Sequence, residues 1–391
     1  MNILVAHNSY KQPGGEDQCV AAEIAMLRTY GHKVIEYRLD NESIDEMSRL
    51  DVACRTIWSL PAFRELQQLF RAQKPQIVHF HNTFPLISPA AYYAARAENV
   101  RVVQTLHNFR LCCSNALLFR DGKVCEACLG KSFGWPGIVH KCYRNSRVAA
   151  AAIAGMVATH RILGTWQNAI HVYIALSEFS RRKLLEGGLP AHKIVIKSNF
   201  AYPDPGLGAG TGRYAVFVGR LSAEKGVEAL LKAWRHLGGR LPLKIIGDGP
   251  LATLVREAAK KNTTVQWLEN LPLDTVYKIV GGATFLVLPS QCYENFPRVI
   301  IEAFAKGTPV IVSKLGAMAE IVQDGHTGLH FRPGDPVDLA DKVRSMLADP
   351  LRLVRMRQAA RQKFDECFTA DVNYRNLAAI YARALDVRHT A

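Results

Sequence analysis

The sequence predicts an α/β protein with two domains, each a parallel β-sheet covered by helices. Short apolar runs rich in Val and Ile alternate with longer segments of helical period along the whole chain. Parallel sheets with helical crossovers produce this alternation. The chain has 391 residues, which is more than one hydrophobic core usually organises, so two domains of roughly 200 residues are expected.

The expected strands divide into two series separated by Ser198–Gly212, where Pro and Gly interrupt the sequence and no apolar periodicity survives. The predicted domains are therefore residues 1–200 and 213–370, and a final helix is expected within residues 371–391. The strands are expected at Ile3–Ala6, Lys33–Tyr37, Ile77–Phe80, Val102–Leu106, Val172–Leu176 and Ile194–Ile196, then at Ala215–Val218, Leu243–Ile246, Val265–Trp267, Phe285–Leu288 and Val310–Val312.

Composition predicts a folded, cytoplasmic protein. Hydrophobic residues make up 49% and charged residues 21% of the chain, as in ordinary globular domains. The first residues lack the basic start and apolar core of a secretory signal. The most apolar stretch, Val148–Thr159, is bracketed by Arg147 and Arg161 and is shorter than the roughly 20 residues that a membrane crossing requires.

Positive charge is concentrated in one segment. The net charge is +15, and residues 101–200 hold 14 Lys and Arg against 4 Asp and Glu, whereas residues 1–100 hold 10 against 11. Such a field favours an anionic partner, whether a membrane surface, a phosphorylated substrate or nucleic acid. A solvated basic face that keeps the protein soluble explains it equally simply.

In the first domain, two places beyond the ends of predicted strands carry candidate ligand contacts. Ligands bind beyond the carboxyl ends of parallel strands. Gly14 and Gly15 follow the first strand and open a helix, where backbone N–H groups can contact an anion or a sugar oxygen, although tight-turn glycines need no ligand. His107 follows the strand Val102–Leu106 and can bond a substrate hydroxyl, but most lone histidines do not.

The second domain carries a stronger pattern. Arg220 and Lys225 lie in GRLSAEKG, directly after a strand and at the start of a helix, so two cations and a helix dipole can act on one diphosphate. Glu294 and Glu302 follow the strand Phe285–Leu288. Glu302 lies within an otherwise apolar helix, where ribose hydroxyls would offset its burial; a pair with a nearby Arg is the alternative.

These residues resemble the donor site of family 4 retaining glycosyltransferases. The resemblance rests on VGRLSAEKG followed by PSQCYENFPRVIIEAFAKGTPV, with its E-x7-E spacing, and it covers nearly the whole chain. It implies the GT-B fold, in which two Rossmann-like domains face each other across a cleft and a C-terminal helix crosses back to the first domain. Residues 1–200 would then be the acceptor side, and residues 213–370 would bind the nucleotide sugar.

The resemblance also implies roles for individual residues. Arg220 and Lys225 would bind the donor diphosphate and stabilise it as a leaving group, in place of a metal ion. Glu302 would hold the ribose. The donor sugar would be oriented by Glu294 and by the backbone of Asn295 and Phe296.

In the first domain, Gly14 and Gly15 would approach the sugar and phosphate, and His107 would lie near the anomeric carbon. Pro297 departs from the family pattern, because it has no N–H to donate to the sugar.

Together these features predict a metal-independent glycosyltransferase that retains anomeric configuration. It would move a sugar from a nucleotide sugar, UDP- or GDP-linked, to a saccharide or lipid-linked acceptor in polysaccharide or glycoconjugate synthesis. The alternatives are a GT-B protein that binds a nucleotide without catalysis and a basic nucleic-acid-binding protein. Nucleic acid is not expected as a partner, since no motif for it is present and Val148–Thr159 interrupts the basic segment.

Two further expectations concern the basic segment and its cysteines. Cys113, Cys125, Cys128 and Cys142 lie in a long loop, residues 108–145, with a C-x2-C core that commonly binds structural zinc, although unligated or disulfide-paired thiols explain it as well. The run Arg181 to Lys183 and the helix Val148–Thr159 are expected to attach this domain peripherally to the inner face of an anionic membrane. A buried Ala-rich helix is the alternative for Val148–Thr159.

Overall fold

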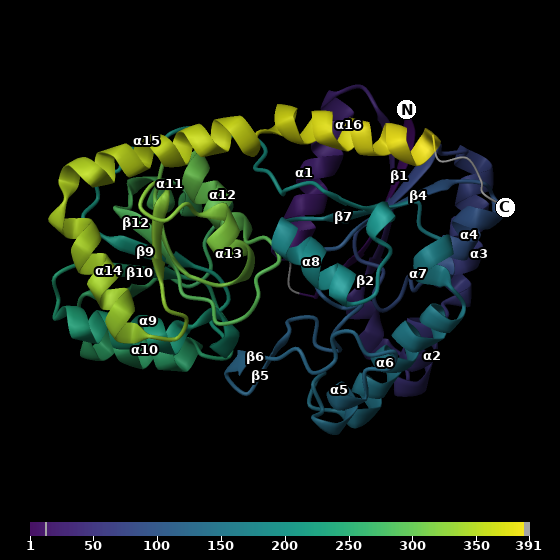
Figure 1. The fold of residues 1–391 in the computed structure, drawn as a ribbon, viewed down its shortest axis with the longest axis horizontal. Helices are drawn as coiled ribbons and strands as arrows, with labels where there is room; N and C mark the ends of the chain where they lie inside the picture. The colour runs from purple at the N-terminus through teal and green to yellow at the C-terminus, as the bar shows by residue number, and fades with distance from the viewer. Residues whose placement is uncertain (12–13, 387–391) are drawn as a thin grey trace. The chain divides into compact units, whose positions relative to one another are not determined.

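The computed structural model describes residues 1–11 and 14–386, and the chain forms two compact units (Figure 1). Unit 1 contains Met1–Leu118, Cys125–Ser198 and the chain from Asn373 onward, and unit 2 contains Phe119–Val124 and Asn199–Val372. The change of unit after Ser198 falls at the start of the stretch rich in Pro and Gly.

Unit 1 is built on a parallel sheet of six strands in the order β2-β1-β3-β4-β7-β8. Its central strands are buried on both faces, which is why they read as continuous apolar runs in the sequence. The strands are β1 (Asn2–Ser9), β2 (Lys33–Asp40), β3 (Ile77–Phe80), β4 (Arg101–Thr105), β7 (Val172–Ala175) and β8 (Ile194–Ile196).

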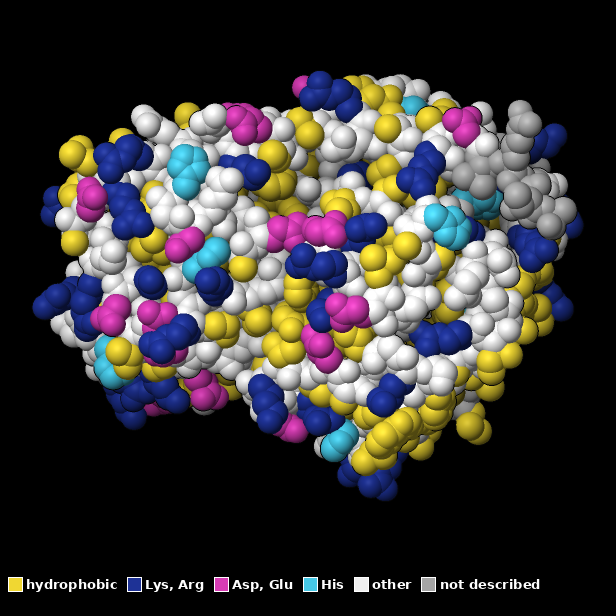
Figure 2. Space-filling model, in the orientation of Figure 1, with side chains coloured by type: hydrophobic (Ala, Val, Ile, Leu, Met, Phe, Trp, Pro, Cys, Tyr) yellow, Lys and Arg dark blue, Asp and Glu magenta, His cyan; other side chains and the backbone are white. Residues whose placement is uncertain are grey.

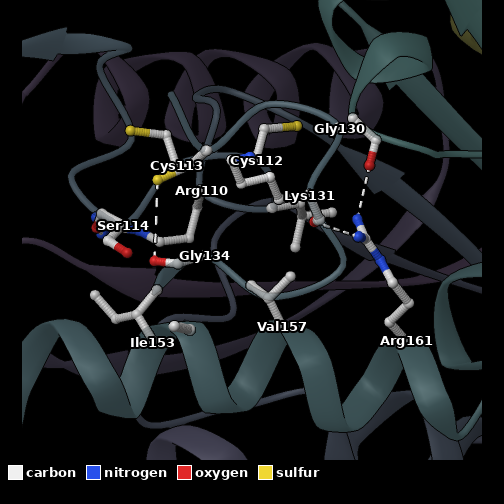
Figure 3. A pocket seen from close by; sticks show the side chains of 14 residues that line it. Arg110, Cys112, Cys113, Ser114, Gly130, Lys131, Gly134, Ile153, Val157 and Arg161 are labelled. Carbon is white, nitrogen blue, oxygen red and sulfur yellow. Dashed lines mark hydrogen bonds between the residues drawn. The ribbon is translucent and has the colours of Figure 1, made fainter. Parts of the chain in front are cut away.

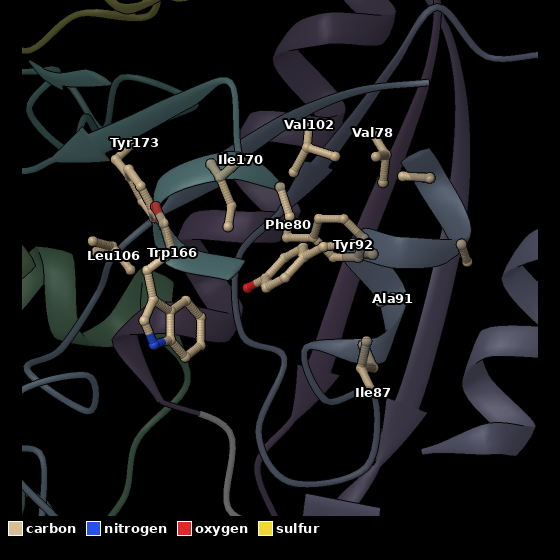
Figure 4. Packing of buried hydrophobic residues seen from close by; sticks show 14 of the residues in the cluster. Val78, Phe80, Ile87, Ala91, Tyr92, Val102, Leu106, Trp166, Ile170 and Tyr173 are labelled. Atoms are coloured by element: carbon tan, nitrogen blue, oxygen red, sulfur yellow. The ribbon is translucent and has the colours of Figure 1, made fainter. Parts of the chain in front are cut away.

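The core of unit 1 lies between this sheet and its helices (Figure 4). Phe80 and Tyr92 pack edge to face at 5.1 Å between ring centroids, and the buried Tyr92 hydroxyl donates to Gln104. The helices are α1 (Gly15–Thr29), α2 (Arg49–Ile57), α3 (Leu60–Gln73), α4 (Ala90–Ala97), α5 (Trp135–Val139), α6 (Arg147–Ile162), α7 (Thr165–Asn168) and α8 (Glu178–Glu186), with 3₁₀ turns at Asn41–Glu46 and Ala191–Lys193.

Unit 2 repeats the scheme with the strand order β11-β10-β9-β12-β13-β14, again all parallel. Its strands are β9 (Ala215–Val218), β10 (Leu243–Ile246), β11 (Val265–Trp267), β12 (Phe285–Leu288), β13 (Val310–Ser313) and β14 (Gly328–Phe331). The short hairpin of β5 (Phe119–Arg120) and β6 (Lys123–Val124), within the cysteine-containing loop, also groups with unit 2.

The helices of unit 2 pack around a hydrophobic core that includes Trp234, which is buried in α9. They are the 3₁₀ turn η3 (Ala223–Lys225), α9 (Val227–Leu237), α10 (Ala252–Lys261), α11 (Leu273–Gly282), α12 (Arg298–Ala305), α13 (Gly316–Ile321), α14 (Pro336–Ala348) and α15 (Pro350–Cys367). The predicted doubly covered α/β architecture is confirmed, and β14 is a strand that the sequence pattern did not indicate.

The last helix, α16 (Ala370–Asp386), belongs to unit 1 from Asn373 onward. Tyr374 stacks on Tyr30 with ring centroids 3.6 Å apart. The buried Tyr381 hydroxyl lies 2.9 Å from His79 Nδ1. The predicted return of the C-terminal helix to the first domain is therefore observed.

Candidate functional site

Two neighbouring strands of unit 2, β9 and β12, end at the same edge of the sheet. The loop after β9 carries Lys225, and the loop after β12 carries Glu294. Lys225 Nζ donates to Glu294 Oε1 at 2.5 Å, and the Ser290 hydroxyl donates to the same oxygen at 2.6 Å. Residues that are distant in sequence thus form one polar cluster beyond the carboxyl end of the sheet.

Gly226 explains how the two loops approach so closely. It has φ +71°, and a Cβ there would lie 1.9 Å from the Pro289 carbonyl oxygen. Only glycine fits both the backbone conformation and the available space. The amide of Gln291 also donates to the Glu224 carbonyl at 2.8 Å, so the backbone itself fixes Lys225 beside Glu294.

Electrostatics keep Lys225 charged. Burial is the largest single influence and lowers the pKa of its ammonium group, but Glu294, Cys292 and Glu224 together outweigh burial, and the pKa is raised overall. Arg220, which follows Gly219 after β9, is exposed and takes part in none of the ion pairs formed by the described residues. The site therefore presents one fixed cation and one cation open to solvent.

Glu302 lies inside α12 and is buried beside Arg298. Arg298 Nη2 lies 3.3 Å from Glu302 Oε1, so the pairing that the sequence left as an alternative to ribose binding is present. Arg298 Nε and Nη1 are also buried, and within the described residues neither has a hydrogen-bond partner. Arg298 is not among the residues singled out from the sequence, although its i, i+4 spacing from Glu302 could have indicated the pair.

Asn295 and Phe296 are both buried in the same loop. The Phe296 carbonyl accepts a hydrogen bond from Asn199 Nδ2 at 3.3 Å. Pro297 is the N-cap of α12. The six donor-site residues predicted in the second domain, Arg220, Lys225, Glu294, Asn295, Phe296 and Glu302, all lie in unit 2 on the loops or helices that follow β9 and β12.

Gly14, Gly15 and His107 belong to unit 1. Gly14 caps α1, and its N–H donates to Asp17 Oδ2 at 2.8 Å. The same carboxylate lies 2.9 Å from His7 Nε2. The start of α1 is thus occupied by an acidic side chain of its own first turn.

Glu16 is the neighbouring acid. It accepts a hydrogen bond from the Tyr10 hydroxyl at 2.9 Å. Burial is the largest influence on this carboxyl and raises its pKa to about 7, against the smaller opposing effect of His7. A carboxyl whose pKa is raised to about 7 thus lies in the first turn of α1.

His107 Nε2 lies 2.9 Å from His81 Nδ1. Burial, reinforced by His81, holds the pKa of His107 well below its usual range, and burial with His79 lowers the pKa of His81 to about 3. Both rings are therefore neutral at pH 7. His107 can exchange hydrogen bonds with a sugar but does not present a positive charge.

Behind His81 lies a buried ionic network centred on Glu23. Glu23 Oε2 accepts from Lys197 Nζ at 2.9 Å, and Glu23 Oε1 lies 2.9 Å from His79 Nδ1 and 3.2 Å from His81 Nε2. Among the described residues, Glu23, His79 and His81 are the set whose potential metal-ligand atoms all lie within 4.8 Å of one another. Because Lys197 already neutralises the carboxylate and would repel a cation, we assign the network a structural role.

The predicted zinc ligands Cys113, Cys125, Cys128 and Cys142 all lie in unit 1 and are partly buried. Cys113 and Cys128 line a pocket between the cysteine-containing loop and α6 (Figure 3). Burial and then Cys113 raise the pKa of the Cys128 thiol to about 11, and Cys142 and Cys125 act in the same direction. Within the described residues, the four cysteine sulfur atoms do not form a group in which all atoms lie within 4.8 Å of one another, as the ligand atoms of Glu23, His79 and His81 do.

Several of the residues expected to contact a membrane make contacts within unit 1. Lys183 forms ion pairs with Glu126 and Glu186, and Arg181 pairs with Glu178, so the cationic run is largely neutralised. One face of α6 is buried, through Ala150, Ile153, Ala154, Met156 and His160. That face packs inside unit 1, so it is not available to a membrane.

Fold and site together define a GT-B glycosyltransferase architecture. The model for glycosyl transferases group 1 matches residues 204–363, and the model for Glycosyltransferase Family 4 matches residues 34–203. Together the two models span residues 34–363, and the chain belongs to the family 4 glycosyltransferases of the GT-B type.

Curated relatives match part of the chain. A glycogen synthase of Mycobacterium tuberculosis is 34% identical over 174 residues, which are 43% of this chain and 41% of the relative. An alpha-maltose-1-phosphate synthase of Mycolicibacterium smegmatis is 34% identical over 168 residues, 39% and 43% of the two chains. The match thus spans about two fifths of the length of each of these relatives.

Solved structures match over nearly the full length. HepE of Anabaena, crystallised in complex with UDP, superposes with a TM-score of 0.69 at 17% identity and covers 98% of this chain and 100% of its own. Sucrose-phosphate synthase of Thermosynechococcus elongatus gives a TM-score of 0.73 at 15% identity, with coverage of 98% and 100%. At this identity the likeness establishes the fold.

Among residues 1–11 and 14–386, none of the helices combines the length and the apolar character that crossing a membrane requires.

Proposed function

We propose that the protein is a retaining glycosyltransferase that moves a sugar from a nucleoside diphosphate sugar to a saccharide or lipid-linked acceptor in polysaccharide or glycoconjugate synthesis. The observation that carries this proposal is the cluster in unit 2, where Lys225 is held against Glu294 and Arg220 lies exposed after the same strand. Fixed and accessible cations beyond β9 suit a diphosphate.

Each residue then has a role in the reaction. The acceptor hydroxyl oxygen attacks the anomeric carbon on the face from which the diphosphate departs, the carbon–oxygen bond to the phosphate breaks, and a departing phosphate oxygen takes the hydroxyl proton. Arg220 and Lys225 stabilise the charge that develops on the leaving group, so this chemistry needs no metal ion. Glu294, with the backbone of Asn295 and Phe296, orients the sugar, and Glu302 binds the ribose.

On the acceptor side, Gly14 and Gly15 would approach the sugar and phosphate, and His107 would lie near the anomeric carbon. A neutral His107 suits hydrogen bonding to a sugar hydroxyl. The donor base is uracil or guanine; the UDP bound by HepE favours uracil.

The cysteine-containing loop is a separate part of the proposal. Cys113, Cys125, Cys128 and Cys142 would hold one structural zinc ion after rotation of their side chains, because a C-x2-C core with two further thiols supplies four ligands. The loop has little regular structure, and Ala116, Leu118, Lys141 and Arg144 all have positive φ, so a cross-link would offset the cost of holding it.

Elemental analysis of the purified protein tests the zinc site. We expect about one zinc per chain, lost in the Cys125→Ser, Cys128→Ser double variant and retained in Cys54→Ser, which changes an exposed cysteine on α2. Protein without metal, with Cys125 and Cys128 freely reactive, would contradict the assignment.

The transfer reaction is tested in two steps. Thermal shift against UDP-, GDP- and ADP-sugars identifies the donor, since a ligand at 100 times its Kd adds about 2.7 kcal/mol of stability. NMR of the product then reports the anomeric configuration. Donor binding without transfer to any saccharide or lipid-linked acceptor would favour the nucleotide-binding alternative, and inverted product would exclude a retaining mechanism.

A further inference from the structure

A group of large hydrophobic side chains is exposed around α5 in unit 1. Trp135 is 53% exposed, Val139 51%, Phe133 42% and Val148, at the start of α6, 71%. We call these four residues the α5 surface. Figure 2 shows hydrophobic side chains gathered in the region of α5 and α6, with Lys and Arg side chains at the margins.

The backbone beneath this surface is held firmly. Pro136 and Gly137 of α5 are buried. The Arg161 guanidinium on α6 donates to the Lys131 carbonyl at 2.6 Å and to the Gly187 carbonyl at 2.7 Å, and Figure 3 shows Arg161 reaching toward Lys131. The hydrophobic side chains are therefore presented by a packed segment, and exposed groups of this kind mark interaction sites.

The charge around the α5 surface has one sign. Residues 127–177 contain five Lys and Arg and no Asp or Glu. Lys131, Lys141, Arg144 and Arg147 are all exposed, and Lys131 Nζ lies 5.9 Å from the centre of the Trp135 ring. This contrasts with Arg181 and Lys183, which are paired with carboxylates.

We propose that the α5 surface docks unit 1 onto an anionic lipid bilayer. Trp135, Phe133, Val139 and Val148 would enter the interfacial region, while the neighbouring Lys and Arg contact lipid phosphates. Trp side chains prefer the boundary between lipid and water. Stable membrane attachment generally needs two kinds of contact. The combination of apolar and cationic side chains is therefore the informative feature of the α5 surface. Docking requires no donor and stands apart from the proposed sugar transfer, although it would bring a lipid-linked acceptor within reach.

The test is co-sedimentation of the full chain with vesicles of phosphatidylcholine, with and without phosphatidylglycerol. We expect binding to the anionic vesicles only, weakened by salt. The Lys141→Glu, Arg147→Glu double variant should lower the partition coefficient at least about tenfold, since each cation near an anionic surface contributes roughly fivefold. Trp135→Ser should also lower it, whereas the matched controls Leu351→Ser and Arg355→Glu, at exposed positions of α15, should bind as the wild type does.

Three outcomes would overturn the docking proposal: equal binding to neutral and anionic vesicles, unchanged binding in both α5 variants, or a loss as large in the controls. Double-stranded DNA serves as a competitor. If DNA displaces the protein and Trp135→Ser has no effect, the segment is a general polyanion site and the membrane assignment fails. Since activity toward a soluble acceptor does not enter these measurements, failure here leaves the proposed transfer reaction intact.

Discussion

The two units differ in whether their clustered charged groups are already buried and paired. In unit 1, Glu23, His79, His81 and Lys197 are almost fully buried and contact one another. In unit 2, Lys225 retains partial exposure and Arg220 is open to solvent. Buried charges that already have partners hold a structure together, whereas accessible cations can still bind a ligand. Position at the end of a parallel strand therefore does not by itself identify a binding residue.

The largest effect is expected in the buried network. Glu23→Gln should reduce the free energy of unfolding by about 3–5 kcal/mol, because Lys197 would remain buried without a counter-charge. Chemical denaturation measures this, with Glu228→Gln, an exposed position on α9, as the control. A Glu23→Leu, Lys197→Met double variant should recover much of the loss, and a change as small as that of the control would remove the contrast between the units.

Loss of the unit 2 cations should act on catalysis. Lys225→Ala and Arg220→Ala should each lower turnover more than tenfold with the fold intact, because each removes charge stabilisation from the leaving diphosphate. The matched control is Lys232→Ala, which removes an exposed charge from α9. Normal turnover in both variants would end the assignment of the donor site.

Glu16 provides a pH-dependent test in unit 1. Its pKa is raised to about 7 by burial, so the folded state binds its proton more tightly than the unfolded state does. This contribution to stability is fully present below about pH 4.5 and is lost as the pH rises to about 7. Glu16→Gln should therefore raise the free energy of unfolding by about 3 kcal/mol at pH 8 and change it little at pH 4. Thermal melts of the variant and the wild type at both pH values measure this difference. The same difference at pH 4 and at pH 8 would contradict the prediction.

The smallest effect is expected at Glu302. Because its carboxylate already contacts Arg298, Glu302→Gln should weaken binding of the nucleoside diphosphate several-fold without abolishing it. Isothermal titration measures the affinity. An unchanged Kd would assign Glu302 to the pair with Arg298 alone.

The sequence predicted the regular parts of the fold well because buried parallel strands such as Ile77–Phe80 appear as unbroken apolar runs. The strand β14, with the sequence GLHF, was not predicted because it starts with glycine and is short. The residues proposed for the donor site could be singled out because they lie in two compact motifs. The network of Glu23 with His79, His81 and Lys197 was not, since these residues are distant in sequence and only the fold brings them together.

The place of α16 in unit 1 has a consequence for synthesis of the protein. Lys197 Nζ donates to Asn373 Oδ1 at 3.1 Å, and His79 contacts Tyr381, so α16 encloses the buried ionic network of unit 1. The ribosome must make all of Asn199–Val372 first, which at about 5–20 residues per second delays closure by on the order of 10–30 s. During that interval the nascent first unit leaves the apolar and polar surface under α16 exposed, and chaperones would recognise it there.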